Sequence, residues 1–277
     1  MQMIIPSYQL EEVYLEGADN KQLSGGCMYD IFLSHSREQK KDIAIPLAEE
    51  LMGVGFHVWI DKRYIQFGSQ IYSNIEAAID NSYLGVVIAS GEFIKKDWPM
   101  YELKRLYEKD IESILLILYS IDIDDISTEF PALHSIAYER WDPHDMTRIV
   151  ARVVASYYAH KMRIYGYCGF DMLKNKIASM STFSEHHRKM LWSLIDMYIN
   201  CYNDTRSKAI ALYNLIGYIK GISDHYHGHC SHELLVAYKF VQKTMQSIIP
   251  ALDPLDYDIF IAIENAAKHA IMTIAYT

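Results

Sequence analysis

The sequence predicts an α/β fold in its first half and an all-α region in its second half, and two observations support this division. Between residues 28 and 162, short runs of β-branched and aromatic residues alternate with segments of helical periodicity. After residue 164, apolar residues recur three or four positions apart. Strands that alternate with helices imply a parallel sheet with both faces covered. An uninterrupted helical spacing instead indicates a small bundle.

The first half contains five predicted strands, at residues 29–34, 56–61, 84–90, 113–119 and 135–139. Helices are predicted at residues 37–53 and 71–79, at a segment that starts near Asp97, and at residues 143–162. Gly53 and Gly55 are expected to end the first of these helices. Five strands with short crossovers favour the order 2-1-3-4-5, which is the flavodoxin-like arrangement of a parallel sheet.

These patterns divide the chain into three parts. Residues 1–26 form an N-terminal extension that ends in turn-forming residues. Residues 27–163 form the α/β domain. Residues 164–277 are expected to form an all-α domain of four or five helices, with a regulatory or assembly role.

Composition excludes several classes of function. The chain has 277 residues and a formal net charge of −9, which argues against nonspecific nucleic-acid binding. Its apolar runs are too short to span a membrane, and its N-terminus does not resemble a signal peptide. Four cysteines lie scattered along the chain without the spacing of a disulfide framework. We therefore expect reduced thiols and a cytoplasmic location.

The predicted topology also locates a site. In open parallel sheets, ligands bind beyond the carboxyl ends of the strands where the winding reverses, here between strands one and three. The segments at those ends are residues 34–37 and 90–102. Asp97 is expected to be the N-cap of the next helix, with Pro99 in its first turn. Trp98 and Glu102 are four residues apart and therefore share a helix face.

An indole beside a carboxylate suits a planar cationic ring that is attached to a sugar. The structural alternative is that Trp98 packs against the sheet and Glu102 is a carboxylate favoured by the helix dipole. Other functions of this fold fit less well. Residues 34–36 lack the acidic side chains of a phospho-receiver. The chain has no phosphate loop rich in glycine, serine and threonine after the first strand, as a flavin site requires. It also lacks the glycine fingerprint of a Rossmann dinucleotide site there.

Several blocks of the sequence occur in the order found in TIR domains, and the chain resembles the bacterial type. The matching blocks are YDIFLSHS at 29–36, GFHVWID at 55–61, IQFGSQI at 65–71, residues 75–82, VVIAS at 86–90 and WPMYEL at 98–103. The resemblance covers about residues 28–160, which is roughly half of the chain.

The resemblance implies an NAD⁺ nucleosidase that cleaves the nicotinamide–ribose bond and yields nicotinamide with ADP-ribose or a cyclic isomer. It places the catalytic glutamate of the family's W-x-x-x-E pattern at Glu102. It also implies that His35, Ser36 and Arg37 line the cleft near the adenosine or phosphate part of the substrate, with Trp98 near the nicotinamide. Arg37 has a plain surface role as its alternative. The loop that contains Gly68 resembles one that mediates TIR–TIR stacking and covers the site.

NAD⁺ is the substrate in this interpretation, so no cofactor and no metal are expected. The expected partners are further copies of the chain, through TIR–TIR contacts, and a trigger or regulatory partner of the helical region, in a bacterial antiviral defence setting. Two alternatives stay open. One is a non-catalytic TIR scaffold for protein assembly, and the other is an enzyme that synthesises a cyclic signalling nucleotide.

Residues 224–233 form a histidine-rich segment. It contains His225, His227, His229 and His232 with Cys230, which are residue types that bind zinc. The spacing matches no established zinc motif. A turn between two helices, with Ser231 as the cap of the second, explains the segment equally well.

Overall fold

The fold is described from a computed structural model of the chain. The structure describes residues 29–60, 71–166, 169–180, 183–201, 204–248 and 255–275. The predicted N-terminal extension and Gly68 therefore lie outside the described residues.

The first half contains a five-stranded parallel sheet in the order β2-β1-β3-β4-β5, as predicted. Its strands are β1 (Tyr29–His35), β2 (Val58–Ile60), β3 (Ser82–Ser90), β4 (Ile114–Tyr119) and β5 (Tyr138–Arg140). The helices of this half are η1 (Arg37–Gln39), η2 (Lys40–Ala44), α2 (Ile45–Gly53), α3 (Ile71–Asp80), α4 (Asp97–Asp110), η3 (Ile111–Ser113), α5 (Ile123–Ser127), η4 (Pro131–Ser135) and α6 (Met146–Met162).

The start of the last strand and one additional helix differ from the prediction. The last strand begins at Tyr138 rather than at residue 135, because a 3-10 turn that starts at Pro131 occupies the positions before it. Helix α5 was not predicted. A capping box starts it, in which the Asp125 carboxylate accepts the Asp122 N–H at 2.9 Å. Two aspartates three residues apart are a weak form of the usual capping signature.

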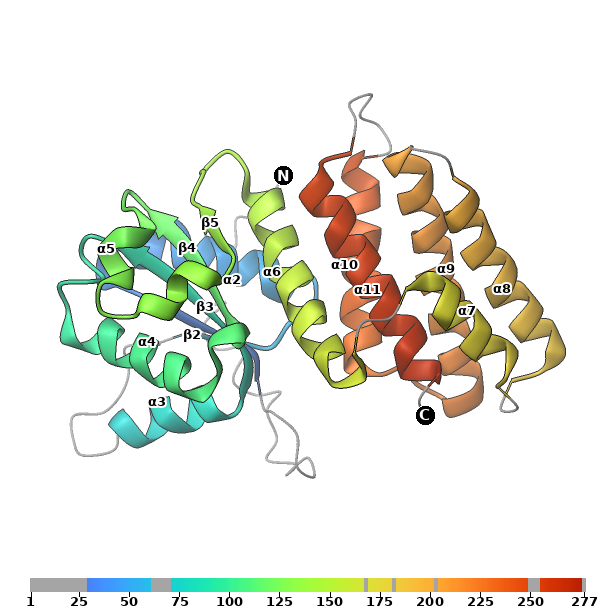
Figure 1. Ribbon diagram of the computed structural model, residues 1–277, viewed down its shortest axis with the longest axis horizontal. Coiled ribbons are helices and arrows are strands. Elements are labelled where there is room, and N and C mark those ends of the chain that lie inside the picture. Colours follow the sequence, from blue (N-terminus) through green and yellow to red (C-terminus); the bar gives the residue numbers. More distant parts are fainter. Residues whose placement is uncertain are drawn as a thin grey trace, which may run out of the picture.

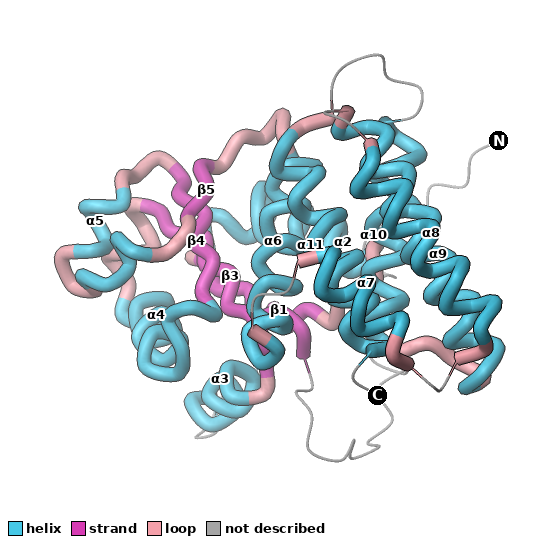
Figure 2. Tube along the Cα trace, turned by 45° about the vertical axis from the view of Figure 1, so that its right-hand side comes forward, coloured by secondary structure: helices cyan, strands magenta, loops and turns pink. Residues whose placement is uncertain are grey.

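Side chains alternate between the two faces of the sheet, and each face has its own apolar core. Ile31, Leu33 and Val86 pack with α2 and α6 on one face. Phe32 and Val87 pack with α3 and α4 on the opposite face. Figure 2 shows α3 and α4 on one side of the strands, with α6 and the helical half on the other. Alternation therefore also decides that Ser34, two residues after Phe32, belongs to the α4 side.

Among its described residues, the second half contains helices and the turns that connect them, and no strand. Its helices are η5 (Arg163–Tyr165), α7 (Phe170–Ala178), α8 (Glu185–Asn200), α9 (Thr205–His227), α10 (His232–Ile248) and α11 (Tyr257–Ala275). Five of these, α7 to α11, are α-helices, so among the described residues the expectation of four or five helices is confirmed. Ser231 caps α10 as predicted, because its hydroxyl oxygen accepts the N–H of Leu234 at 3.2 Å.

Helix α6 lies between the sheet and the helical half, and it contacts both (Figure 1). The Asn265 side chain on α11 donates to the Ala155 carbonyl on α6 at 3.2 Å. The Tyr158 hydroxyl on α6 donates to the Glu233 carbonyl on α10 at 2.7 Å. One apolar cluster runs from the sheet through α6 into α11, so the two halves share a core.

Gly55 allows a second close approach between the halves. Its φ of +103° lies in the left-handed region, which a residue with a Cβ rarely adopts. A Cβ at this position would lie 3.4 Å from the Lys239 side chain and 3.5 Å from that of Val236, both on α10. Gly55, which follows the C-cap of α2, therefore also gives α10 room beside it.

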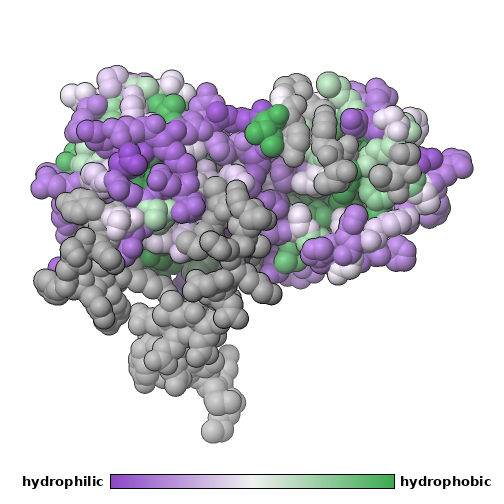
Figure 3. Space-filling model, turned by 90° about the horizontal axis from the view of Figure 1, so that it is seen from below, coloured by the Kyte–Doolittle hydropathy of each residue, from purple (hydrophilic) through white to green (hydrophobic). Residues whose placement is uncertain are grey.

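The surface is mixed in character. Figure 3 shows a mostly hydrophilic face over the sheet half, with apolar residues between polar ones on the helical half. Met172, Trp192 and Met197 of α7 and α8 are among the exposed large apolar side chains. Among the described helices, none combines the length and the apolar character that a bilayer span requires.

Candidate active site

Glu102 lies at the carboxyl edge of the sheet, where the topology predicted a site. It occupies the second turn of α4, which begins at Asp97, after the turn that follows the end of β3 at Ser90. Its residue exposure is only 3%. The Ser34 hydroxyl, near the end of β1, donates to its Oε2 at 2.5 Å. The switch point between strands one and three is therefore bridged by a serine and a carboxylate that are buried together.

The start of α4 differs from the prediction. Lys96 in extended conformation is the N-cap, and the helix begins at Asp97, so Asp97 is its first residue rather than its cap. No side-chain hydrogen bond caps this end. An aspartate in the first turn is still favoured by the helix dipole, and Pro99 tolerates a first-turn position because no N–H partner is needed there.

Glycine in β3 sets how closely α4 approaches the sheet. A Cβ built on Gly85 would lie 2.7 Å and 2.9 Å from the two methyl carbons of Leu106. Leu106 is one helical turn after Glu102 and is itself buried. The bare backbone at Gly85 therefore lets α4 pack tightly, and this close packing positions Glu102 beside Ser34.

Trp98 is half-buried on the same face of α4 as Glu102, and it packs against the apolar core beneath that helix. Its ring lies 5.9 Å from that of Tyr101, and the Tyr101 hydroxyl donates to Glu76 of α3 at 2.6 Å. The structure thus supports the packing role that was weighed as an alternative for Trp98, while keeping the indole on the face that carries Glu102.

A second polar cluster occupies the same edge of the sheet. Ser36 and Ser90, at the ends of β1 and β3, are both buried and both donate to the side-chain oxygen of Gln39. The distance from the Ser90 hydroxyl is 2.9 Å. The Ser90 oxygen also accepts the N–H of Phe93 at 3.1 Å. This network holds the loop after β3 against the turn after β1.

The predicted substrate residues after β1 fall into three environments. Ser36 is buried within the network around Gln39. His35 is half-buried, and its Nδ1 hydrogen-bonds the Ser36 carbonyl at 2.9 Å. Arg37 is exposed, in agreement with the surface alternative. Sequence reasoning placed Ser34 and Ser90 at the right edge but gave neither a role, and it missed Gln39.

Lys96 and Glu38 form an ion pair on the solvent-exposed side of this edge of the sheet. The Lys96 ammonium hydrogen-bonds the Glu38 carboxylate, which joins the segment before α4 to the turn after β1. This hydrogen bond lowers the pKa of Glu38 to about 2. Because both side chains are exposed, the pair contributes little to stability.

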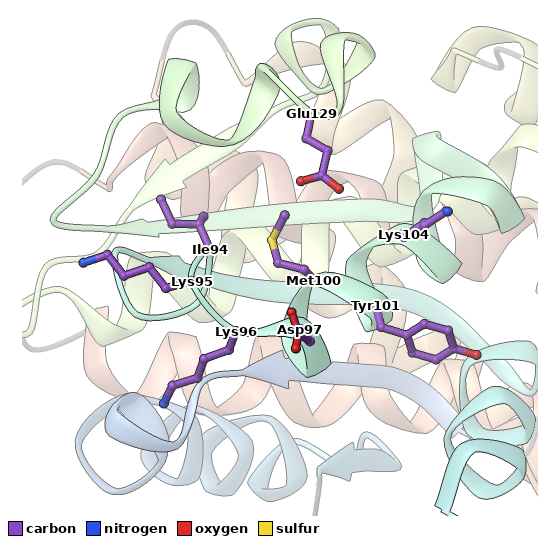
Figure 4. Close-up of a pocket in the computed structure, with 8 residues that line it drawn as sticks. All are labelled: Ile94, Lys95, Lys96, Asp97, Met100, Tyr101, Lys104 and Glu129. Carbon is purple, nitrogen blue, oxygen red and sulfur yellow. The ribbon is translucent and has the colours of Figure 1, made fainter.

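A hollow of about 360 Å³ lies beside the first turns of α4 (Figure 4). Its lining consists of Ile94, Lys95, Lys96, Asp97, Met100, Tyr101, Lys104 and Glu129. Met100 and Lys104 are each two residues from Glu102, which places them on the opposite side of the helix. This hollow is therefore separate from the Ser34–Glu102 site.

Comparison with known proteins agrees with the motif blocks. The sequence model of the TIR domain family matches residues 31–150. The 2′ cyclic ADP-D-ribose synthase AbTIR of Acinetobacter baumannii is 38% identical over 108 residues, which are 38% of this chain and 40% of that protein.

Two further relatives are similar over comparable lengths. The 2′ cyclic ADP-D-ribose synthase BtTIR of Bacteroides thetaiotaomicron is 36% identical over 108 residues, which are 38% of each chain. The NAD(+) hydrolase PdTIR of Paracoccus denitrificans is 29% identical over 139 residues, which are 49% of this chain and 46% of that protein. The chain thus spans less than half the length of these curated relatives.

Proposed function

We propose, from the premise that residues 31–150 form a TIR domain, that this protein cleaves NAD⁺ at the nicotinamide–ribose bond. The observation that carries the proposal is the position of Glu102, a buried carboxylate at the switch point of the sheet, hydrogen-bonded to Ser34. Relatives named as NAD(+) hydrolases and cyclic ADP-ribose synthases support the choice of substrate.

One carboxylate is sufficient for this reaction. Ordinary glycosidases need a second carboxyl group to protonate the departing oxygen. Nicotinamide departs from a pyridinium and becomes neutral as the bond to C1′ breaks, so no proton has to be supplied. Glu102 would stabilise the positive charge that develops on the ribose, and a site shielded from water strengthens that effect.

Two acceptors can complete the reaction. Attack by water on the ribose centre gives ADP-ribose, whereas attack by a hydroxyl of the same ADP-ribose gives a cyclic isomer. Both products release nicotinamide, so nicotinamide release reports the shared step. The identity of the product formed with nicotinamide, either ADP-ribose or its cyclic isomer, distinguishes hydrolysis from cyclisation.

Glu102 is covered in the single chain, so a substrate reaches it only after a rearrangement. We therefore propose that the active form is an assembly of several chains, in which the surroundings of Glu102 are rearranged. Specific activity should then rise with protein concentration. A specific activity independent of concentration would contradict this part of the proposal.

The test compares nicotinamide release from NAD⁺ by the wild type and by Glu102→Gln at high protein concentration, with chromatography and mass analysis of the products. We expect the variant to be slower by about 100-fold or more, which is the usual cost of removing one group that stabilises a transition state. Glu108→Gln is the matched control, because Glu108 is an exposed glutamate of the same helix.

Equal nicotinamide release by the wild type and Glu102→Gln would overturn the catalytic proposal. Absence of turnover in the wild type, with assembly intact, would favour a TIR scaffold instead.

A further inference from the structure

Three side chains that can bind a metal converge at the amino ends of β1 and β2, at the opposite edge of the sheet from Glu102. Asp30 lies on β1, His57 immediately precedes β2, and His232 is the first residue of α10. Among the described residues, their candidate ligand atoms all lie within 4.8 Å of one another. His232 belongs to the histidine-rich segment but lies beside two residues of the sheet half, whereas His225, His227 and His229 are exposed.

One carboxylate oxygen is the centre of this cluster. Asp30 Oδ2 lies 2.7 Å from His232 Nε2 and 3.9 Å from His57 Nδ1. Two ligand atoms at about 2.05 Å from a tetrahedral zinc ion are roughly 3.3 Å apart. The two distances to Asp30 are therefore within about 0.6 Å of that spacing. The ligand atoms of His57 and His232 also lie within 4.8 Å of each other.

The two imidazoles are stacked on each other, with centroids 4.3 Å apart and an angle of 10° between the planes. The Asp30–His232 hydrogen bond alone does not require His57 to lie there. Because an imidazole nitrogen binds a metal ion in the plane of its ring, the two rings have to turn out of this parallel stack before both nitrogens can face one ion. The observation that suggests a third ligand is the closeness of a His57 ring nitrogen to Asp30 and His232, not the stacking of the rings.

The surroundings of Asp30 are those of an oriented metal ligand. The Tyr157 hydroxyl on α6 donates to Oδ1 at 2.8 Å, and the His57 N–H donates to Oδ2 at 2.8 Å. Such outer hydrogen bonds fix the direction of a ligating carboxylate. The Asp30 side chain is 6% exposed, whereas that of His57 is 64% exposed, so the cluster is buried on one side and open on the other. The open side provides a path for an ion to enter.

We propose that Asp30, His57 and His232 bind one Zn²⁺ ion, which joins the sheet to the helical half. One carboxylate and two imidazoles are a common zinc ligand set, and water completes the coordination. Because the ligands come from β1, the segment before β2 and the start of α10, the ion cross-links segments far apart in the sequence. Zn²⁺ then holds the first turn of α10 against the amino edge of the sheet.

The test is equilibrium dialysis of the full chain, without a polyhistidine tag, against Zn²⁺ alone, followed by metal analysis. We expect one Zn²⁺ per wild-type chain. His57→Ala and His232→Ala should lower the affinity by about 100-fold or more, and Tyr157→Phe by roughly 10- to 100-fold. His229→Ala is the matched control, because His229 is an exposed histidine of the same segment, and it should bind as the wild type does.

His57→Ala is the decisive variant, since it leaves the Asp30–His232 hydrogen bond in place and therefore preserves the fold. Thermal unfolding gives a second readout. Zn²⁺ should raise the Tm of the wild type and of His229→Ala, but not that of His57→Ala. A wild-type chain that retains no Zn²⁺, or a His57→Ala variant that binds it as tightly as the wild type, would overturn the proposal.

Discussion

The Ser34 hydroxyl hydrogen-bonds the Glu102 carboxylate across the switch point of the sheet, although the two residues are 68 positions apart in the sequence. Both residues are buried. Ser34 belongs to the face of β1 that α4 covers, and Gly85 lets α4 come close enough for the contact. This pair connects the packing of the fold to the proposed chemistry, because the same hydrogen bond that stabilises Glu102 also fixes its direction.

The first prediction concerns the Ser34–Glu102 pair. Ser34→Ala removes the donor and leaves a buried carboxylate with one hydrogen bond fewer, so we expect the free energy of unfolding to fall by about 1–3 kcal/mol. Nicotinamide release should also fall, because Glu102 loses one of the groups that hold it in place. Urea unfolding and the NAD⁺ assay measure the two effects separately.

A double-mutant cycle is the control for this prediction. If the hydrogen bond couples the two residues, the destabilisation by Ser34→Ala together with Glu102→Gln will differ from the sum of the single effects. Ser135→Ala, an exposed serine far from the pair in sequence, should leave stability nearly unchanged. Strict additivity within error would mean that the two side chains do not interact in solution.

The second prediction concerns the contact between β3 and α4. Gly85→Ala introduces a Cβ that would lie 2.7 Å from a methyl carbon of Leu106, so either Leu106 or the whole helix must shift. We expect a loss of about 1–3 kcal/mol in the free energy of unfolding, which is typical of overpacking. Nicotinamide release should fall as well, because α4 carries Glu102.

A second substitution tests whether the contact with Leu106 causes this destabilisation. In Gly85→Ala combined with Leu106→Ala, the space for the new methyl group is restored, so the pair should cost less than the two single effects combined. Gly91→Ala serves as the control, since a Cβ there meets no atom within 4 Å. If Gly85→Ala is as harmless as Gly91→Ala, the close packing is not what positions α4.

The sheet and the edge that carries the site could be predicted from the sequence, because they follow from local patterns. Alternating strands and helices favour one strand order, and that order determines which strand ends lie together. The element bounds were less predictable. A 3-10 turn displaced the start of β5, and the N-cap of α4 is Lys96 rather than Asp97, since neither position carries a strong local signal.

The contacts between distant segments could not be predicted. Glu102 was identified by its motif, but its hydrogen bond with Ser34 depends on how closely two elements pack. The Asp30–His232 contact joins residues 202 positions apart and depends on how α10 docks. The histidine-rich segment suggested a local cluster, whereas the docking of the helical half places His232 beside Asp30. Helical periodicity shows which face of a helix is buried but not what it is buried against.

The third prediction concerns His269, a buried histidine of α11 at 4% exposure that packs against Tyr158 of α6. Burial lowers its pKa from 6.5 to about 4, opposed by Glu233 and assisted by Lys161. Among the described residues its buried Nδ1 has no hydrogen-bond partner. A histidine held neutral in this way binds a proton more readily in the unfolded chain than in the folded one.

The free energy of unfolding is expected to fall as the pH falls. Because the pKa in the folded state is the lower one, the contribution of His269 to stability is complete above pH 6.5 and is lost progressively as the pH falls toward 4. At pH 5 the loss should be about 2 kcal/mol. His269→Leu cannot titrate, so the free energy of unfolding of this variant should fall less between pH 7.5 and pH 5 than that of the wild type.

Urea unfolding of both proteins at a series of pH values measures this difference. Acid also protonates carboxylates in both proteins, and for carboxylates remote from His269 this effect is common to both proteins and cancels in the comparison. His186→Leu provides a control, because His186 is exposed and its removal should leave the pH dependence unchanged. Parallel curves for the wild type and His269→Leu would show that His269 titrates near its ordinary pKa, and thus that water reaches it between α6 and α11.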